Sequence, residues 1–156
     1  MLRDWGILKY RYGQMKRTEI ACQFHTLGIH QGENTSTTMI SSAYYEKYSL
    51  PQLQEQSEYI HSQDQIFVLH MCGLLKNLLH LIKQVGIEGI HSLTPPPVGD
   101  TPFRYAYDII GNKTSIRGRF GSTLWFGQNP DEIKKNLLDI VDAELIKINR
   151  SYCWSH

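Results

Sequence analysis

Short apolar runs along the chain alternate with longer segments in which apolar residues recur at helical spacing. The short runs are rich in β-favouring residues and predict strands at residues 28–32, 65–71, 88–93 and 114–119. The clearest of them is QIFVLHM, Gln65–Met71, which is typical of a strand buried on both faces of a parallel sheet. The pattern therefore predicts four strands with helical segments between them.

Helices are predicted in the segments that separate and flank these strands. Their expected bounds are 8–27, 43–62, 74–85 and 102–110, and a further helix should begin at Asn129, the N-cap of an Asn-Pro-Asp-Glu start. Ser42 is the expected N-cap of the second helix, and Pro51 should kink or split that helix near Leu50. Gly86 is placed to end the third helix.

The alternation of strands with helices is typical of βαβ units in a parallel sheet. A complete eight-unit barrel typically needs about 250 residues, whereas this chain has 156. We therefore expect an α/β fold, a single partial (β/α)8 TIM barrel domain over residues 1–156 with parallel strands and outer helices. Half a barrel leaves strand edges and apolar faces uncovered, so self-association is also expected.

Composition and charge narrow the classes of partner. Hydrophobic residues make up 41% and charged residues 20% of the chain, as in ordinary globular proteins. The formal net charge of +1 argues against nucleic acid as a partner. No apolar run approaches the roughly 18 residues of a membrane span, and the N-terminus lacks the apolar core of a signal peptide. We therefore expect a cytoplasmic protein without a membrane segment.

The cysteines point to a metal site or to free thiols. The chain has three cysteines, Cys22, Cys72 and Cys153, and an odd number cannot form a fully paired disulfide framework. His70 and Cys72 lie two residues apart on a predicted strand, so their side chains should leave it on the same face, where barrel active sites assemble. Imidazole and thiolate are good zinc ligands. The competing interpretation is a hydrogen-bonded core histidine beside a small buried cysteine.

Several ordered motifs along the chain resemble the uroporphyrinogen decarboxylase family. The family typically shows "ISP-x-x-(Y/F)-E" at a helix start, followed by "H-x-C-G", "GD" and "G-T-P-E-E". The matching segments are Met39–Ser41 with Tyr45–Pro51, Ile66–Gly73 (IFVLHMCG), Gly86–Leu93, Val98–Asp100 and Asn129–Ile133. The resemblance is strongest over residues 28–143.

The chain departs from the family pattern in three places. Ser42 stands where the family has a proline, Arg117–Ser122 replaces the usual "GG-(I/V)-D", and Ala143–His156 replaces the glycine-rich turn and final strands. The N-terminal half, where the decarboxylases of this family keep the arginines and aspartate that hold the tetrapyrrole, has no counterpart here. This difference argues against decarboxylation by this chain alone.

Within the family, the chain is most similar to the C-terminal half of the branch that moves methyl groups. The resemblance implies zinc held by His70, Cys72 and a later cysteine, for which Cys153 is the candidate. It also implies a thiol substrate such as coenzyme M and a methylated corrinoid protein as the methyl donor. Two alternatives stay open: a uroporphyrinogen decarboxylase of tetrapyrrole biosynthesis, and a non-catalytic truncated half barrel.

Other polar residues are weaker candidates. Glu33, in the loop after the first strand, and Asp100, after the proline-rich loop, are the candidate catalytic carboxylates. His91 is expected to face the pocket in a supporting or structural role. Arg117 and Arg119 alternate on the last strand and either hold an anionic group or lie exposed at a sheet edge. The five other histidines, His25, His30, His61, His80 and His156, show no mutual metal-ligand spacing.

Overall fold

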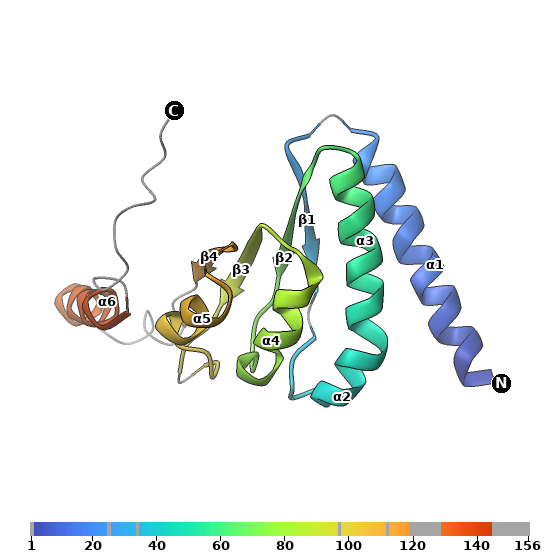
Figure 1. Ribbon diagram of the computed structural model, residues 1–156. Helices are drawn as coiled ribbons and strands as arrows, with labels where there is room; N and C mark the ends of the chain where they lie inside the picture. Colours follow the sequence, from blue (N-terminus) through green and yellow to red (C-terminus); the bar gives the residue numbers. More distant parts are fainter. Residues whose placement is uncertain are drawn as a thin grey trace.

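Four parallel strands form one sheet in the computed structural model, which describes residues 2–24, 26–33, 35–96, 98–111, 113–118 and 129–144. The strands are β1 (Gly28–Gly32), β2 (Ile66–His70), β3 (Gly89–Leu93) and β4 (Ser115–Gly118). They lie side by side in chain order, β1-β2-β3-β4 (Figure 1). The predicted parallel sheet is confirmed, and the α/β architecture agrees with part of a (β/α)8 barrel.

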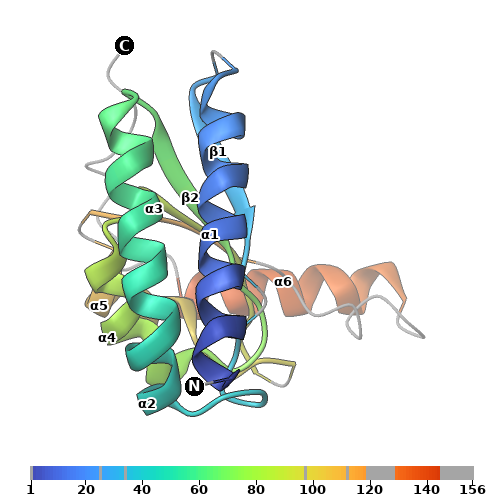
Figure 2. The same cartoon turned by 90° about the vertical axis from the view of Figure 1, so that its right-hand side faces the viewer.

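Helical segments connect and flank the strands. They are α1 (Leu2–Cys22), α2 (Ser42–Tyr44), the π-helical turn η1 (Tyr45–Ser49), α3 (Leu50–Ser62), η2 (Lys76–Leu78), α4 (Leu79–Ile82), η3 (Lys83–Val85), α5 (Phe103–Ile110) and α6 (Pro130–Glu144). Helices α1 and α3 run next to each other along the sheet (Figure 2). Among the described residues, no helix is long and apolar enough to cross a membrane.

The hydrophobic core lies between the helices and one face of the sheet. Phe67 and Leu69 on β2 and Ile90 on β3 are almost fully buried there, together with Leu53 and Ile60 of α3. Side chains alternate between the two faces of a strand, so the residues between these core positions point to the opposite face. That opposite face is the one a barrel would enclose, and it carries the candidate site.

A buried polar contact joins α1, α3 and β1 within this layer. The Gln56 amide on α3 donates hydrogen bonds to the Thr18 hydroxyl of α1 at 2.8 Å and to Gln31 Oε1 of β1 at 3.0 Å. Gln31 Nε2 donates back to Gln56 Oε1 at 3.2 Å. Because buried amides are costly without partners, this network fixes α1 on the outer side of β1.

The second predicted helix runs without a gap over residues 42–62. It is irregular just before Pro51, where the sequence predicts a kink or a break. The Leu50 N–H donates to the Tyr45 carbonyl five residues earlier, which makes the turn before Pro51 π-helical. The N-cap is Ser41, whose Oγ accepts from the Tyr44 N–H at 3.2 Å. The prediction of Ser42 as the cap was therefore wrong by one residue.

Two other helix ends were predicted correctly from a few adjacent residues. Gly86 ends η3 in the left-handed region with φ of +82°, as predicted. Asn129 Oδ1 accepts from the N–H groups of Asp131 and Glu132, and Glu132 Oε2 accepts from the Asn129 N–H, the expected capping box. By contrast, α1 begins and ends about five residues earlier than predicted, at Leu2 and Cys22.

Candidate metal centre

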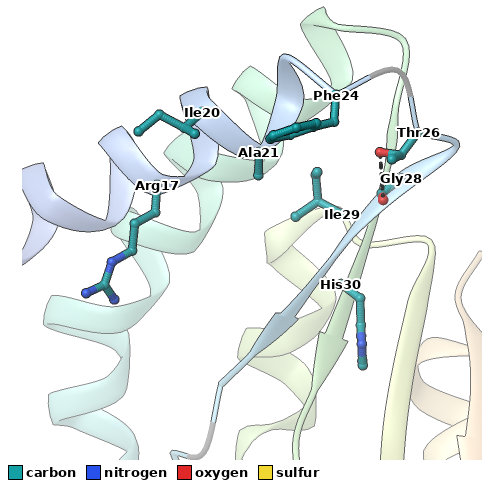
Figure 3. Close-up of a pocket in the computed structure, with 8 residues that line it drawn as sticks. All are labelled: Arg17, Ile20, Ala21, Phe24, Thr26, Gly28, Ile29 and His30. Carbon is teal, nitrogen blue, oxygen red and sulfur yellow. Dashed lines mark hydrogen bonds between the residues drawn. The ribbon is translucent and has the colours of Figure 1, made fainter.

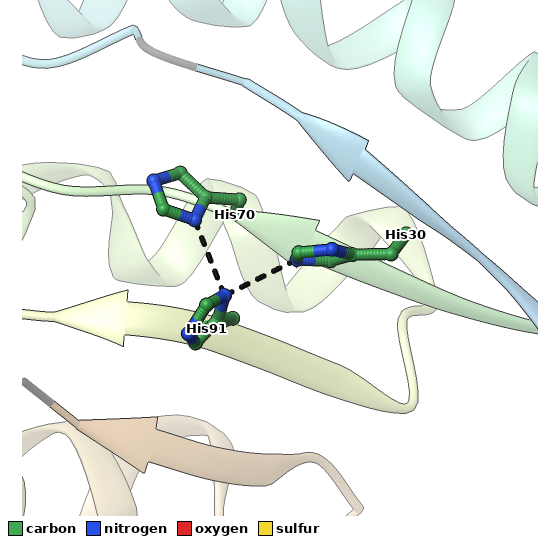
Figure 4. Close-up of side chains that lie close together, drawn as sticks. All are labelled: His30, His70 and His91. Carbon is green, nitrogen blue, oxygen red and sulfur yellow. Dashed lines mark hydrogen bonds between the residues drawn. The ribbon is translucent and has the colours of Figure 1, made fainter.

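Three histidines from three neighbouring strands meet on the face of the sheet opposite the hydrophobic core (Figure 4). His30 lies on β1, His70 is the last residue of β2, and His91 lies on β3. The register pairs His70 with His91 directly, and His30 with Val68, two residues before His70. Since residues two apart share a face, all three imidazoles leave the sheet on the side opposite the core.

The imidazole nitrogens lie close together. His91 Nδ1 is 3.2 Å from His70 Nδ1 and 3.3 Å from His30 Nε2. One nitrogen from each ring can be chosen so that all three lie within 4.8 Å of one another. Two nitrogens bound to the same tetrahedral zinc ion, at Zn–N distances of about 2.0–2.1 Å, are about 3.3–3.4 Å apart. The two short contacts, both made by His91 Nδ1, therefore match two edges of a tetrahedral metal site.

The two contacts of His91 Nδ1 compete with each other. A ring nitrogen carries in its plane either one N–H or one lone pair. His91 Nδ1 faces a ring nitrogen on each side, so a single hydrogen or lone pair serves two contacts (Figure 4). A cation at the centre would accept one lone pair from every ring and remove this competition, which makes the donor set chemically suited to a metal.

The site is open to solvent. His30 is exposed, and His70 and His91 are half-buried. Gly32 pairs with His70 on the neighbouring strand, and a Cβ placed on Gly32 would meet no atom within 4 Å. The space beside the imidazoles is therefore free for a further ligand or a substrate.

The structure places His70 in this cluster, whereas Cys72, its predicted partner on the same segment, is not part of it. Cys72 follows the end of β2 as a half-buried free thiol and is not in the described group of ligand atoms. Cys153 lies outside the described residues, as do His25 and Arg119. Zinc ligation by Cys72 and Cys153 stays a prediction.

Glu33 lies next to the cluster at the end of β1. Its N–H donates to the His70 carbonyl at 2.9 Å, and its carboxylate accepts from the Thr35 hydroxyl. Burial first, and then the negative charge of Glu33, raise the pKa of the Tyr45 phenol well above its ordinary value. The Tyr45 hydroxyl is fully buried and has no hydrogen-bond partner among the described residues. The catalytic role of Glu33 stays a prediction.

Asp100 organises the loop that follows β2. Its Oδ1 accepts from the N–H groups of Leu75 at 2.8 Å and Lys76 at 3.1 Å, and from the Thr101 hydroxyl at 2.8 Å. These bonds cap the turn η2, immediately after the segment that carries Cys72. The structure thus gives Asp100 a positioning function, while its catalytic role stays a prediction.

Arg117 lies on β4, at the position directly beside His91 of the cluster. It pairs in register with His91 and is exposed. A guanidinium on this face lies where an anionic group of a substrate would approach the histidines.

An open groove of about 480 Å³ runs along the outside of β1, next to α1 (Figure 3). It is lined by Arg17, Ile20, Ala21, Phe24, Thr26, Gly28, Ile29 and His30. Ile29 points toward α1, whereas His30 points to the other side of the strand. The groove and the histidine cluster therefore share His30 on β1.

Sequence reasoning did not place His30 in the candidate site and gave His91 only a supporting role. The available signal was that three predicted strands each carry one histidine, at 30, 70 and 91. Spacing along the chain does not reveal the strand register, and it is the register that brings these three positions together.

Comparison with known proteins supports one family. The family model described as Uroporphyrinogen decarboxylase (URO-D) matches residues 25–153, most of the chain. No curated protein and no solved structure matches the chain significantly.

Proposed function

This chain belongs to the uroporphyrinogen decarboxylase family, and from that premise we propose that it carries a zinc centre that activates a thiol for methylation by a corrinoid protein. The observation that supports the proposal is the gathering of metal-ligating side chains around His70 at the carboxyl end of β2. His70 is also the histidine of the His-x-Cys segment on which the resemblance to the methyltransferase branch rests. Coenzyme M stands for the class of small thiol substrate.

A bound zinc ion would lower the pKa of a coordinated thiol, whose proton leaves to solvent. The thiolate sulfur would then form a bond to the methyl carbon while the cobalt–carbon bond breaks and the corrinoid departs in its cob(I) form. The residues of the chain prepare the place for this step. The Glu33 N–H, bonded to the His70 carbonyl, holds the ends of β1 and β2 together and so fixes the backbone from which the His70 imidazole projects. Asp100 orders the loop after β2, which forms the rim of the site.

The open sheet face supports access by two reactants. The imidazoles are exposed or half-buried, and Gly32 leaves space beside His70. A small thiol would approach over β3 and β4, where the exposed Arg117 can pair with an anionic group on it. The methyl donor would then approach from the open side of the sheet.

The experiment measures methyl transfer directly. The purified chain, loaded with zinc, is mixed with methylcobalamin and a small thiol, and the methyl thioether is measured by mass spectrometry. We expect product with the wild-type chain, loss of product after chelation, and loss in His70→Ala. His80→Ala removes an exposed histidine on α4 and should retain activity.

Two outcomes would overturn the proposal. One is absence of thioether from a zinc-loaded, folded chain with any of a panel of thiols. The other is release of carbon dioxide from uroporphyrinogen without any requirement for metal, which would support the decarboxylase alternative.

A further inference from the structure

We infer that His30, His70 and His91 are the protein ligands of one divalent transition-metal ion, and that Cys72 is not a ligand. This inference rests on the proposed function for its biological meaning, because it names the ligands of that zinc centre. Its physical basis is independent of methyl transfer. Neither the family match nor the His-x-Cys segment assigns a role to His30 or His91.

The sheet itself builds the site. The three histidines come from adjacent strands whose backbones are fixed by continuous parallel pairing. The Met71 N–H donates to the His91 carbonyl at 2.9 Å and thereby locks His70 beside His91. Because the backbone is held by its ladder, only imidazole rotations are needed to direct three lone pairs at one point.

One glycine leaves room beside the histidines. Gly32 lies two residues after His30 and by strand alternation shares its face, and a Cβ placed on Gly32 would meet no atom within 4 Å. Gly28 and Gly89 share this face as well, but Ile66 and Val68 fill the space over them. The free space therefore lies at the Gly32 end of the cluster, next to His70.

The donor set selects the class of metal. Three neutral imidazoles suit zinc, copper, nickel and iron, and they leave the full charge of a divalent ion uncompensated. Three protein ligands with one open position form the arrangement of catalytic zinc sites. The open position faces solvent because His30 is exposed.

Cys72 lies outside this arrangement in the described part of the chain. The group of close ligand atoms contains three imidazoles and no sulfur. Beyond His70 the chain leaves the strand and enters the turn that Asp100 caps at Leu75 and Lys76. The Cys72 thiol is then free for a role other than ligation.

The test uses the whole chain, first freed of metal and then titrated with Zn²⁺ and with Co²⁺. We expect one tightly bound ion per chain, with stoichiometric binding lost in His30→Ala and in His91→Ala and kept in Cys72→Ser and His80→Ala. The Co²⁺ form should show visible ligand-field bands without a near-ultraviolet thiolate-to-metal charge-transfer band. Circular dichroism and thermal unfolding establish that each variant is folded, and His30→Gln, at an exposed position, provides a second variant.

Two results would overturn the inference: unchanged binding in folded His30→Ala and His91→Ala, or a charge-transfer band that disappears in Cys72→Ser. The two proposals also fail separately. Metal held by the three histidines without any methyl transfer would leave this site standing and remove the proposed function. Methyl transfer that depends on Cys72 and is indifferent to His30 would do the reverse.

Discussion

Replacing Asp100 tests whether this carboxylate shapes the rim of the site or takes part in chemistry. In Asp100→Ala, the N–H groups of Leu75 and Lys76 and the Thr101 hydroxyl lose their acceptor. Loss of an N-cap side chain costs about 0.5–2 kcal/mol, and Asp100 supplies the same kind of acceptor from a neighbouring loop, because Leu75, the N-cap residue itself, makes no side-chain cap bond. A hydrogen bond to a charged acceptor contributes about 1.5–3 kcal/mol. Since Asp100 is half-buried, we expect a loss of about 2–3 kcal/mol in the free energy of unfolding.

Urea unfolding followed by circular dichroism measures this loss, and the melting temperature should fall by about 5–10 °C. Asp108→Ala is the matched control, because the ion pair of Asp108 with Arg104 on α5 is exposed and its loss should change stability by less than about 0.5 kcal/mol. A loss below about 0.5 kcal/mol in Asp100→Ala would refute the capping argument.

The Asp100→Asn variant separates the two roles. Its amide keeps an oxygen acceptor for the same N–H groups, so the variant should recover most of the stability lost in the alanine variant. If Asp100→Asn retains stability and metal binding together with methyl transfer, Asp100 is a positioning residue. If the variant is stable and forms no product, the carboxylate has a chemical role as well.

Four further predictions follow from particular residues. Tyr45→Phe should leave stability unchanged or raise it by about 1 kcal/mol in urea unfolding, because it removes a buried hydroxyl that lacks a hydrogen bond among the described residues; a loss above about 1 kcal/mol would reveal a missed partner. Gly118→Ala should cost about 1–3 kcal/mol, because its Cβ would overlap the Phe103 ring, whereas Gly32→Ala should cost little, and equal effects would contradict the packing. Zinc at 100 times its dissociation constant should stabilise the chain by about 2.7 kcal/mol in thermal unfolding, and an unchanged melting temperature would count against the site. Sedimentation should show self-association, since α1 exposes large apolar side chains; a stable monomer at high concentration would count against it.

The strands and the sheet could be predicted from sequence because their signals are local. The IFVLH run of β2 and the strand at Gly89 each carry a clear pattern, and the helices between them make parallel pairing the natural arrangement. The capping box at Asn129 and the end at Gly86 also depend on a few adjacent residues. Such features are fixed by backbone chemistry that the sequence displays directly.

The less predictable features depend on competition or on distant contacts. Ser41 and Ser42 are equally good caps, and the choice between them depends on where the helix path enters the core through Tyr45. The meeting of His30 with His91 depends on a register set by two strand pairings across 61 residues. A spacing rule such as His-x-Cys identifies neighbours on one strand and says nothing about the strands beside it.

The placement of the three histidines on three different strands has a kinetic consequence. A metal ion that needs all of them can bind only after β1, β2 and β3 have paired in register. If the pairing of β1, β2 and β3 is already formed in the folding transition state, added metal would speed folding. If the strands pair only later, added metal would slow unfolding and leave the folding rate unchanged. The effect of metal on the folding and unfolding rates would therefore show whether the three strands pair before or after the transition state.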